Sequence, residues 1–186
     1  MTTKVQATIE DLYHIPEHGK AELVNGEIVR MSPTGFWPSR ASGEIFASLR
    51  QHERATKSGY AIPDNAGFIV NLPNRRSFSP DAAWHTGKPT RMKFLEGAPV
   101  FAVEVRSEED YGARAERRLA AKRQDYFAAG TLCVWDVDLL SPDVIKSYHH
   151  NDPENPLIFR RGDVADAGDA VPGWSMPVDD LLPEDE

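Results

Sequence analysis

The sequence predicts a protein of the α/β (α+β) class, and three neighbouring segments carry that prediction. A nearly continuous apolar run over residues 100–105 is typical of a strand covered on both faces, and residues 132–137 show the same pattern. The segment between them has the spacing of a long helix that ends near Gly130. A strand, a helix and a second strand in this order predict a right-handed crossover and parallel pairing of the two strands.

Two local signals organise the N-terminal part of the chain. Thr8, followed three residues later by Asp11, resembles a capping box at the start of a short helix. Within residues 22–29, the pair Asn25-Gly26 accepts positive φ at both turn positions and predicts a hairpin with a type I′ turn. Glu22 is then expected opposite Val29.

A longer helix and several short strands are expected next. Ala41, Ile45 and Leu49 recur every four residues and predict an amphipathic helix of about four turns, which residues 57–59 end. Ser107 with Asp110 is expected to cap the helix that follows residues 100–105. Further strands are expected at residues 67–72, at residues 78–84 entered through Pro80, and at the sheet edge over residues 144–148 and 157–160.

Length and charge bound the class of protein. The 186 residues fit one domain, 1–186, and carry 21 Lys and Arg against 29 Asp and Glu, a formal net charge of −8. That total argues against a protein that coats nucleic acid. Eight acids and no base follow Arg161, so the first 161 residues are neutral and an acidic C-terminal segment, 162–186, supplies the charge. A solvated tail that keeps the protein soluble is the expected role of this segment.

The location follows from what the sequence lacks. Cys133 is the only cysteine, which excludes an intrachain disulfide and a cysteine-based zinc site and favours a reducing compartment. The sequence shows neither a secretory signal nor an apolar stretch of the ~20 residues that a membrane span needs. A cytoplasmic protein without a membrane partner is therefore expected.

Two charged residues lie where apolar ones are expected. Period-two alternation puts Glu104 on one face of a central strand, together with Ala102 and Arg106, where an ionised carboxylate needs a cation or donors. Lys122 lies in the apolar stripe of the following helix, in line with Tyr126. Each has an ordinary explanation: Glu104 pairs with Arg106 or a helix cation, and Lys122 extends its ammonium to water. Alternatively, Lys122 and Glu104 are partners.

Asp81 adds a second carboxylate. It follows Pro80 at the start of a strand that precedes the Glu104 strand. If these strands are neighbours, the two carboxylates converge and need a hard cation or a shared proton. A divalent metal would resolve the conflict.

These residues carry a family resemblance. Pro80-Asp81 followed by Glu104-Val105-Arg106 resembles the PD-(D/E)XK nuclease signature, and the wider frame over about residues 8 to 180 is similar to the Uma-type "putative restriction endonuclease" family of that superfamily. The matching segments are Glu22-Leu23-Val24-Asn25-Gly26-Glu27, Met31-Ser32-Pro33, Ser79-Pro80-Asp81, Glu104-Val105, and Lys122 with Tyr126 and Gly130.

The resemblance implies a restriction endonuclease-like fold with a mixed central β-sheet flanked by helices. It also implies a metal site for Mg²⁺ (or Mn²⁺) at Asp81 and Glu104, with the backbone carbonyl of Val105 as a further ligand. Lys122, on the helix, replaces the lysine that the superfamily carries two residues after the glutamate. Glu22 matches the family's hairpin glutamate and completes the acidic cluster. A homodimer is a further implication, which no residue of this sequence specifies.

The sequence departs from the family pattern at two places. Arg106 stands where the family is usually apolar and could compete with the metal for Glu104. Ser39 or Arg40 stands where relatives often carry a histidine just before the first long helix. Either change could reduce activity.

Two functions follow. The first is a metal-dependent endonuclease that hydrolyses DNA, with Asp81 and Glu104 holding the metal, Lys122 orienting water and stabilising developing charge, and Glu22 supporting them. The second is a nuclease fold without catalysis that binds nucleic acid or protein. The helix expected after Ser107, which runs to about Ala129, carries basic side chains that either hold a phosphate backbone or pair with nearby acids. They are Arg114, Arg117, Arg118, Lys122 and Arg123, to which Arg75-Arg76 can add.

Overall fold

A six-stranded mixed sheet forms the centre of the protein, in the strand order β11-β10-β9-β8-β6-β3. The structure is a computed structural model, and it describes residues 6–15 and 19–183. The strands of this sheet are β3 (Tyr60–Pro63), β6 (Ala82–His85), β8 (Phe101–Val105), β9 (Cys133–Val137), β10 (Ile145–His149) and β11 (Asp152–Phe159). Only β8 and β9 pair in parallel; the other neighbours are antiparallel.

The parallel pair is the predicted strand-helix-strand unit. Helix α3 (Ala113–Ala128) connects β8 to β9, and Gly130, with φ of 105°, allows the chain to leave the helix and enter β9. In register, Glu104 faces Asp136 across this pair. The mixed α+β fold class expected from the sequence is confirmed.

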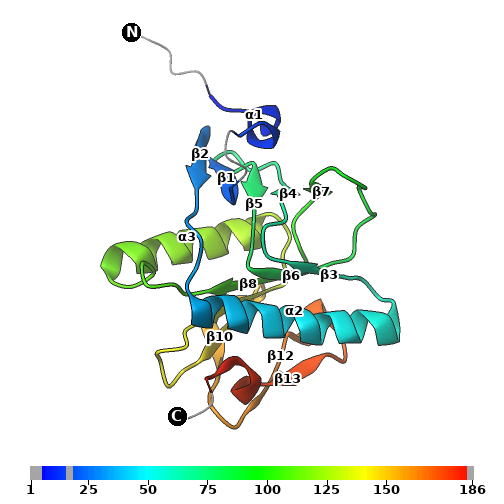
Figure 1. Ribbon diagram of the computed structural model, residues 1–186, viewed down its shortest axis with the longest axis vertical. Helices are drawn as coiled ribbons and strands as arrows, with labels where there is room; N and C mark the ends of the chain where they lie inside the picture. The colour runs from blue at the N-terminus through cyan, green and yellow to red at the C-terminus, as the bar shows by residue number, and fades with distance from the viewer. Residues whose placement is uncertain (1–5, 16–18, 184–186) are drawn as a thin grey trace.

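Helices cover both faces of the sheet. The long helix α2 (Phe36–Thr56) packs Ala41, Ile45 and Leu49 against one face, as their spacing predicts. Helix α3 packs Tyr126 against the other, where it meets Ala102 and the small sheet of β4 (Phe68–Ile69), β5 (Ser77–Phe78) and β7 (Leu95–Glu96). Figure 1 shows α3 above and α2 below the strands β8, β6 and β3.

The N-terminal hairpin lies on the α3 side of the sheet. Strands β1 (Ala21–Val24) and β2 (Glu27–Arg30) pair Glu22 with Val29, and Asn25 and Gly26 both have positive φ, as predicted. The preceding helix α1 (Ile9–Tyr13) begins with the predicted capping box of Thr8 and Asp11. The hairpin brings Glu22 to the sheet, where it is buried.

Several sequence-based expectations about individual elements are wrong, and the strand expected at residues 67–72 is only the short β4 (Phe68–Ile69). The strand expected at residues 78–84 is two strands, β5 and β6, because the chain turns from one sheet to another at Pro80-Asp81. Helix α3 begins at Ala113 without a side-chain cap. Ser107 and Asp110 instead close a turn before the helix, in which the backbone N–H and the hydroxyl of Ser107 both donate to Asp110 Oδ2. The strand at residues 144–148 is not an edge strand, since β11 pairs outside β10.

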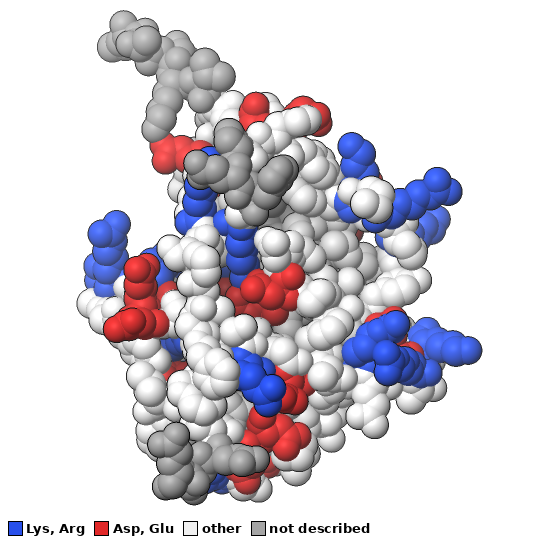
Figure 2. Space-filling model, viewed as in Figure 1, with Lys and Arg blue, Asp and Glu red and all other residues white. Residues whose placement is uncertain are grey.

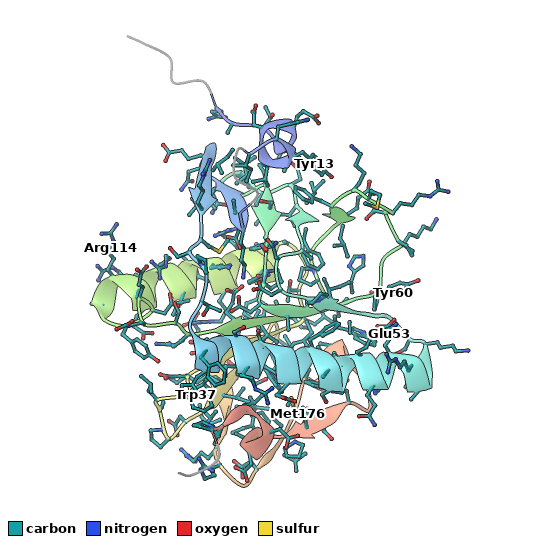
Figure 3. The ribbon with its side chains drawn as sticks, in the orientation of Figure 1. Tyr13, Trp37, Glu53, Tyr60, Arg114 and Met176 are labelled. Carbon is teal, nitrogen blue, oxygen red and sulfur yellow. The ribbon has the colours of Figure 1, made fainter. Side chains whose placement is uncertain are left out.

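The acidic C-terminal segment is folded, contrary to the expectation of a solvated tail. Strands β12 (Val164–Asp166) and β13 (Ser175–Pro177) and the turns η1 (Gly168–Ala170) and η2 (Val178–Leu181) pack beneath α2 (Figure 1). Trp174 lies against Phe101 and Trp135, and Met176, labelled in Figure 3, is buried. Several of the acids accept hydrogen bonds from turn backbone, so charge and core coexist. Glu184, Asp185 and Glu186 lie outside the described residues.

The described part of the chain contains no helix that is both long enough and apolar enough to cross a bilayer.

Candidate active site

Lys122 and Glu104 are partners across the α3–β8 contact. The alternation of β8 turns Glu104 toward α3, and Lys122 Nζ donates to Glu104 Oε2 at 2.8 Å. The same ammonium lies 2.9 Å from Glu22 Oε1, and only 12% of the Lys122 side chain is exposed. Because the ammonium is enclosed by two carboxylates, the explanation in which it extends to water is excluded.

Tyr126 holds the other oxygen of Glu104. Its hydroxyl donates to Glu104 Oε1 at 2.6 Å, and its ring stacks on Phe78 with 4.0 Å between centroids. The sequence placed Tyr126 in the apolar stripe but did not give it a role at the site. The available signal was its position one helical turn after Lys122, since residues four apart share a face.

Glu22 is the most enclosed acid of the cluster. It accepts hydrogen bonds from Arg75 Nη1 at 2.6 Å and from the Ser79 backbone at 2.8 Å. Arg75 also reaches Asp125 on α3, with Nε to Oδ2 at 2.8 Å. Arg75 therefore connects the N-terminal hairpin to α3 and is not available to a nucleic acid.

Asp81 lies at the turn into β6, beside β8. Its Oδ2 accepts from the Val105 backbone N–H at 2.7 Å, which confirms that the Asp81 and Glu104 strands are neighbours. Its Oδ1 lies 2.5 Å from the ammonium of Lys20, which also contacts Asp64 Oδ1 at 2.7 Å. Sequence reasoning missed Lys20, which stands before β1 outside any periodic pattern and gives no local signal.

The charges in this cluster are unevenly compensated. Burial raises the pKa of Glu104, and although Lys122 opposes this, repulsion by Asp81 and Glu22 adds to it. Burial would also raise the pKa of Glu22, but Lys122 and Arg75 outweigh it and lower that pKa. Burial likewise opposes the charge of Lys20 and of Lys122, yet the carboxylates outweigh it and raise the pKa of both ammonium groups. Of these two acids, Glu104 is thus the one whose charge is less well compensated.

Arg106 does not compete for Glu104. Its guanidinium forms a bidentate pair with Asp136, with both N–O distances at 2.7 Å, and it also binds Glu116 at the start of α3. Glu104 on β8 and Arg106, the residue that follows β8, therefore do not pair with each other. The concern that Arg106 displaces a metal from Glu104 is not supported by this geometry.

The second departure from the family pattern, at Ser39 or Arg40, lies within a helix. Ser39 and Arg40 lie inside α2, which begins at Phe36, and not in a loop before it. Arg40 pairs with Glu44 on the same helix, 2.9 Å away. Among the residues that the structure describes, neither of the two contacts the carboxylate cluster.

The basic helix divides into two groups. Arg118 pairs with Asp110 at 2.5 Å, and Arg123 lies over the Tyr148 ring at 3.7 Å from its centroid. Arg114, labelled at the start of α3 in Figure 3, and Arg117 are exposed, with no ion pair to any described residue. Two of the nearby acids pair elsewhere: Glu116 with Arg106 and Asp125 with Arg75.

The donors fit a hard divalent cation in chemistry and charge. Five carboxylates lie close to three cations here, which gives the cluster a formal charge of −2. The carboxylates are those of Glu22, Asp64, Asp81, Glu104 and Asp125, and the cations are Lys20, Arg75 and Lys122. Carboxylate oxygens are the ligands that Mg²⁺ prefers.

The arrangement of these groups does not yet form a metal site. Within residues 6–15 and 19–183, no three His, Cys, Asp or Glu side chains form a ready metal cluster, and the two lysines lie between the acids. Lys20, attracted by both Asp81 and Glu104, holds a positive charge where such a cation would act.

The six-stranded mixed sheet of this α+β fold carries Glu104 on β8 and has Asp81 at the entry to the neighbouring strand β6, and Lys122 reaches Glu104 from the helix that connects β8 to β9. The chain belongs to the Uma2 family, described as "Putative restriction endonuclease", whose model matches residues 8–179. The family resemblance that the motifs predicted is confirmed.

A solved structure agrees with the fold. It is the crystal structure of "a putative nuclease belonging to DUF820" from Anabaena variabilis ATCC 29413, which covers 94% of this chain and 96% of its own with a TM-score of 0.73. At 14% sequence identity this likeness shows the fold alone. The comparison with curated proteins finds no match.

Proposed function

We propose that this protein is a metal-dependent endonuclease that hydrolyses phosphodiester bonds in DNA. The observation that carries the proposal is the Lys122 ammonium, which joins Glu104 and Glu22 at 2.8 and 2.9 Å beside Asp81. Membership of a family described as "Putative restriction endonuclease" supports a nuclease, and DNA is the substrate proposed here.

Asp81, Glu104 and the backbone carbonyl of Val105 are the proposed ligands of Mg²⁺ or Mn²⁺. When bound, the metal would lower the pKa of a water molecule and neutralise charge on the phosphoryl oxygens. The chain itself prepares these ligands: the Val105 N–H orients Asp81, and the Tyr126 hydroxyl orients Glu104. The ligands are therefore held before the substrate arrives, which is the condition for electrostatic stabilisation without reorganisation.

Lys122 is the proposed catalytic cation. Its raised pKa keeps it charged at neutral pH, so it can donate to a water molecule or to a phosphoryl oxygen but cannot act as a base. Glu22 is held by Arg75 and by the Ser79 backbone, and its carboxylate positions the Lys122 ammonium. Glu22 is thus a positioning residue.

Nicking of supercoiled plasmid DNA with Mg²⁺ or Mn²⁺ tests the proposal. Asp81→Ala should abolish nicking, because it removes one proposed ligand and leaves Glu104 alone. Asp143→Ala, which removes a surface carboxylate paired with Arg160, is the matched control and should retain activity. Undiminished cleavage by Asp81→Ala would sink the assignment.

The contact of Lys20 with Asp81 favours a second function, a nuclease-fold protein that binds nucleic acid or protein without catalysis. If Lys20 is a permanent counter-charge, no divalent ion enters. Calorimetry with Mn²⁺ separates the two: micromolar binding that Glu104→Ala removes would count against the second function.

Three further expectations stay predictions: DNA as against RNA, a homodimer, and a cytoplasmic location. Parallel cleavage assays on DNA and RNA check the first, and sedimentation equilibrium checks the second. Fractionation of the native cells checks the third.

A further inference from the structure

A basic groove lies at the far end of the strands that carry the site. It has a volume of about 600 Å³ and is formed by the C-terminal end of α2, the start of β3 and the loop after β6. We call it the α2-end groove; the residues that matter in it are Arg50, Glu53, Arg54, Lys57, Tyr60 and Lys88. Glu53 and Tyr60 are labelled beside the end of α2 in Figure 3.

The charge of the α2-end groove is positive and largely uncompensated. Its one acid, Glu53, is used internally: it pairs with Arg50 and accepts a hydrogen bond from the Ala61 backbone at 2.9 Å. Arg54, Lys57 and Lys88 are exposed, and their side chains have no partner among the residues that the structure describes. Three free cations therefore line a hollow, in a chain whose net charge is −8.

The α2-end groove and the carboxylate cluster lie at opposite ends of strand β6. Tyr60 pairs with His85 at the groove end of β3 and β6, and Pro63 pairs with Ala82 at the end next to Asp81. The five extended steps from Asp81 to Thr86 cover about 16 Å. In Figure 2 acidic side chains gather near the middle of the face shown, and basic side chains lie along one edge, over the end of α2 and the loop between β6 and β7.

This spacing suits a duplex. Nucleic acid advances about 3.4 Å per nucleotide along its axis, so 16 Å corresponds to about five base pairs. We propose that the α2-end groove binds the phosphate backbone of a nucleic acid about five base pairs from the phosphodiester at Asp81 and Glu104. The α2-end groove thus extends the proposed function, on which this placement rests, by naming a second anchoring surface away from the reaction centre.

The expected size of the effect follows from counter-ion release. Each phosphate contact contributes about 0.9 to the slope of log K against log salt, or about eightfold in affinity at 0.1 M salt. Removing Arg54 and Lys88, one from each wall, should flatten the slope by about 1.8 and, if both contacts are fully lost, weaken binding by about 60-fold at 0.1 M salt. If the groove instead bound an apolar ligand, the loss of affinity in this variant would not depend on salt concentration.

Fluorescence anisotropy with a labelled 20-base-pair duplex in EDTA tests the proposal without cleavage. The groove variant is Arg54→Gln/Lys88→Gln. Arg160→Gln/Arg161→Gln is the matched control, with the same charge change in the turn before β12. Wild type and control should bind alike, with the groove variant at least tenfold weaker and less dependent on salt.

Equal affinity and equal salt slope for the groove variant and wild type would overturn the proposal. So would a loss of binding to anionic phospholipid vesicles with DNA affinity retained, since a membrane would then be the ligand. A plasmid-nicking assay run beside it separates the two proposals. Groove-dependent binding without any nicking leaves the α2-end groove in place and refutes the endonuclease, whereas nicking with groove-independent binding does the reverse.

Discussion

Replacing Lys20 by methionine should strengthen divalent metal binding. The Lys20 ammonium lies 2.5 Å from Asp81 Oδ1 and 2.7 Å from Asp64, and 15% of its side chain is exposed. A cation that binds Asp81 must first displace this ammonium. Methionine keeps an unbranched side chain of comparable length and removes only the charge, so the perturbation is confined to the competition.

The magnitude follows from the contact that is lost. A hydrogen bond between charged groups contributes about 1.5–3 kcal/mol net. If a divalent ion must break that contact in the wild type but not in Lys20→Met, its Kd should fall by about 10- to 150-fold in the variant. The raised pKa of Lys20 keeps the ammonium charged across the neutral range, so the difference should not depend on pH there.

Calorimetric titration with Mn²⁺ measures this directly. Lys20→Arg, which keeps a cation beside Asp81, should bind no better than wild type, and Lys88→Met controls for the removal of one positive charge elsewhere. Thermal melting of each variant establishes that the fold is retained. Equal or weaker Mn²⁺ binding by Lys20→Met, or no binding by either protein, would refute the view that Lys20 holds the place of a metal.

Three other predictions concern stability. Because burial and the neighbouring carboxylates Asp81 and Glu22 disfavour the charge of Glu104, Glu104→Gln should raise Tm, and calorimetry that shows a lower Tm would contradict this. The pKa of Glu22 is lowered from 4.5, so its contribution to stability is present above that pH and lost as pH falls through the folded value; urea midpoints should drop in acid, and Glu22→Gln should reduce that drop. Trp174→Ala should cost about 3–5 kcal/mol in urea unfolding, since it empties a buried site between Phe101 and Trp135, and a loss below 1 kcal/mol would show that this packing is dispensable.

Local patterns predicted most of the elements. Asn25-Gly26 fixed a turn because both residues accept positive φ, and the four-residue spacing of Ala41, Ile45 and Leu49 identified the buried face of α2. The alternation of β8 and the helical stripe of α3 were enough to bring Glu104 and Lys122 together. In each case the signal is a spacing within a few residues, which periodicity detects.

Long-range contacts were out of reach of the same reasoning. Lys20 meets Asp81 only because the β1–β2 hairpin folds onto the sheet, and Arg75 reaches Glu22 and Asp125 from a loop without periodicity. The acidic segment was misjudged for a related reason. Its acids dominate the composition, whereas Trp174 and Met176, which bury it, are isolated apolar residues in a polar stretch.

The buried C-terminal segment also determines when, during synthesis, the core of the protein can close. Helix α2 is synthesised early, but the side of the core beneath it is closed by Trp174, Met176, Val178 and Leu181, near the end of the described chain. A ribosome that has reached Gly162 has made every residue assigned to the carboxylate cluster and none of this closing layer. A nascent chain therefore contains all the proposed catalytic groups before the core beneath α2 can close, and the activity proposed above should appear only once η2 (Val178–Leu181) has joined the core.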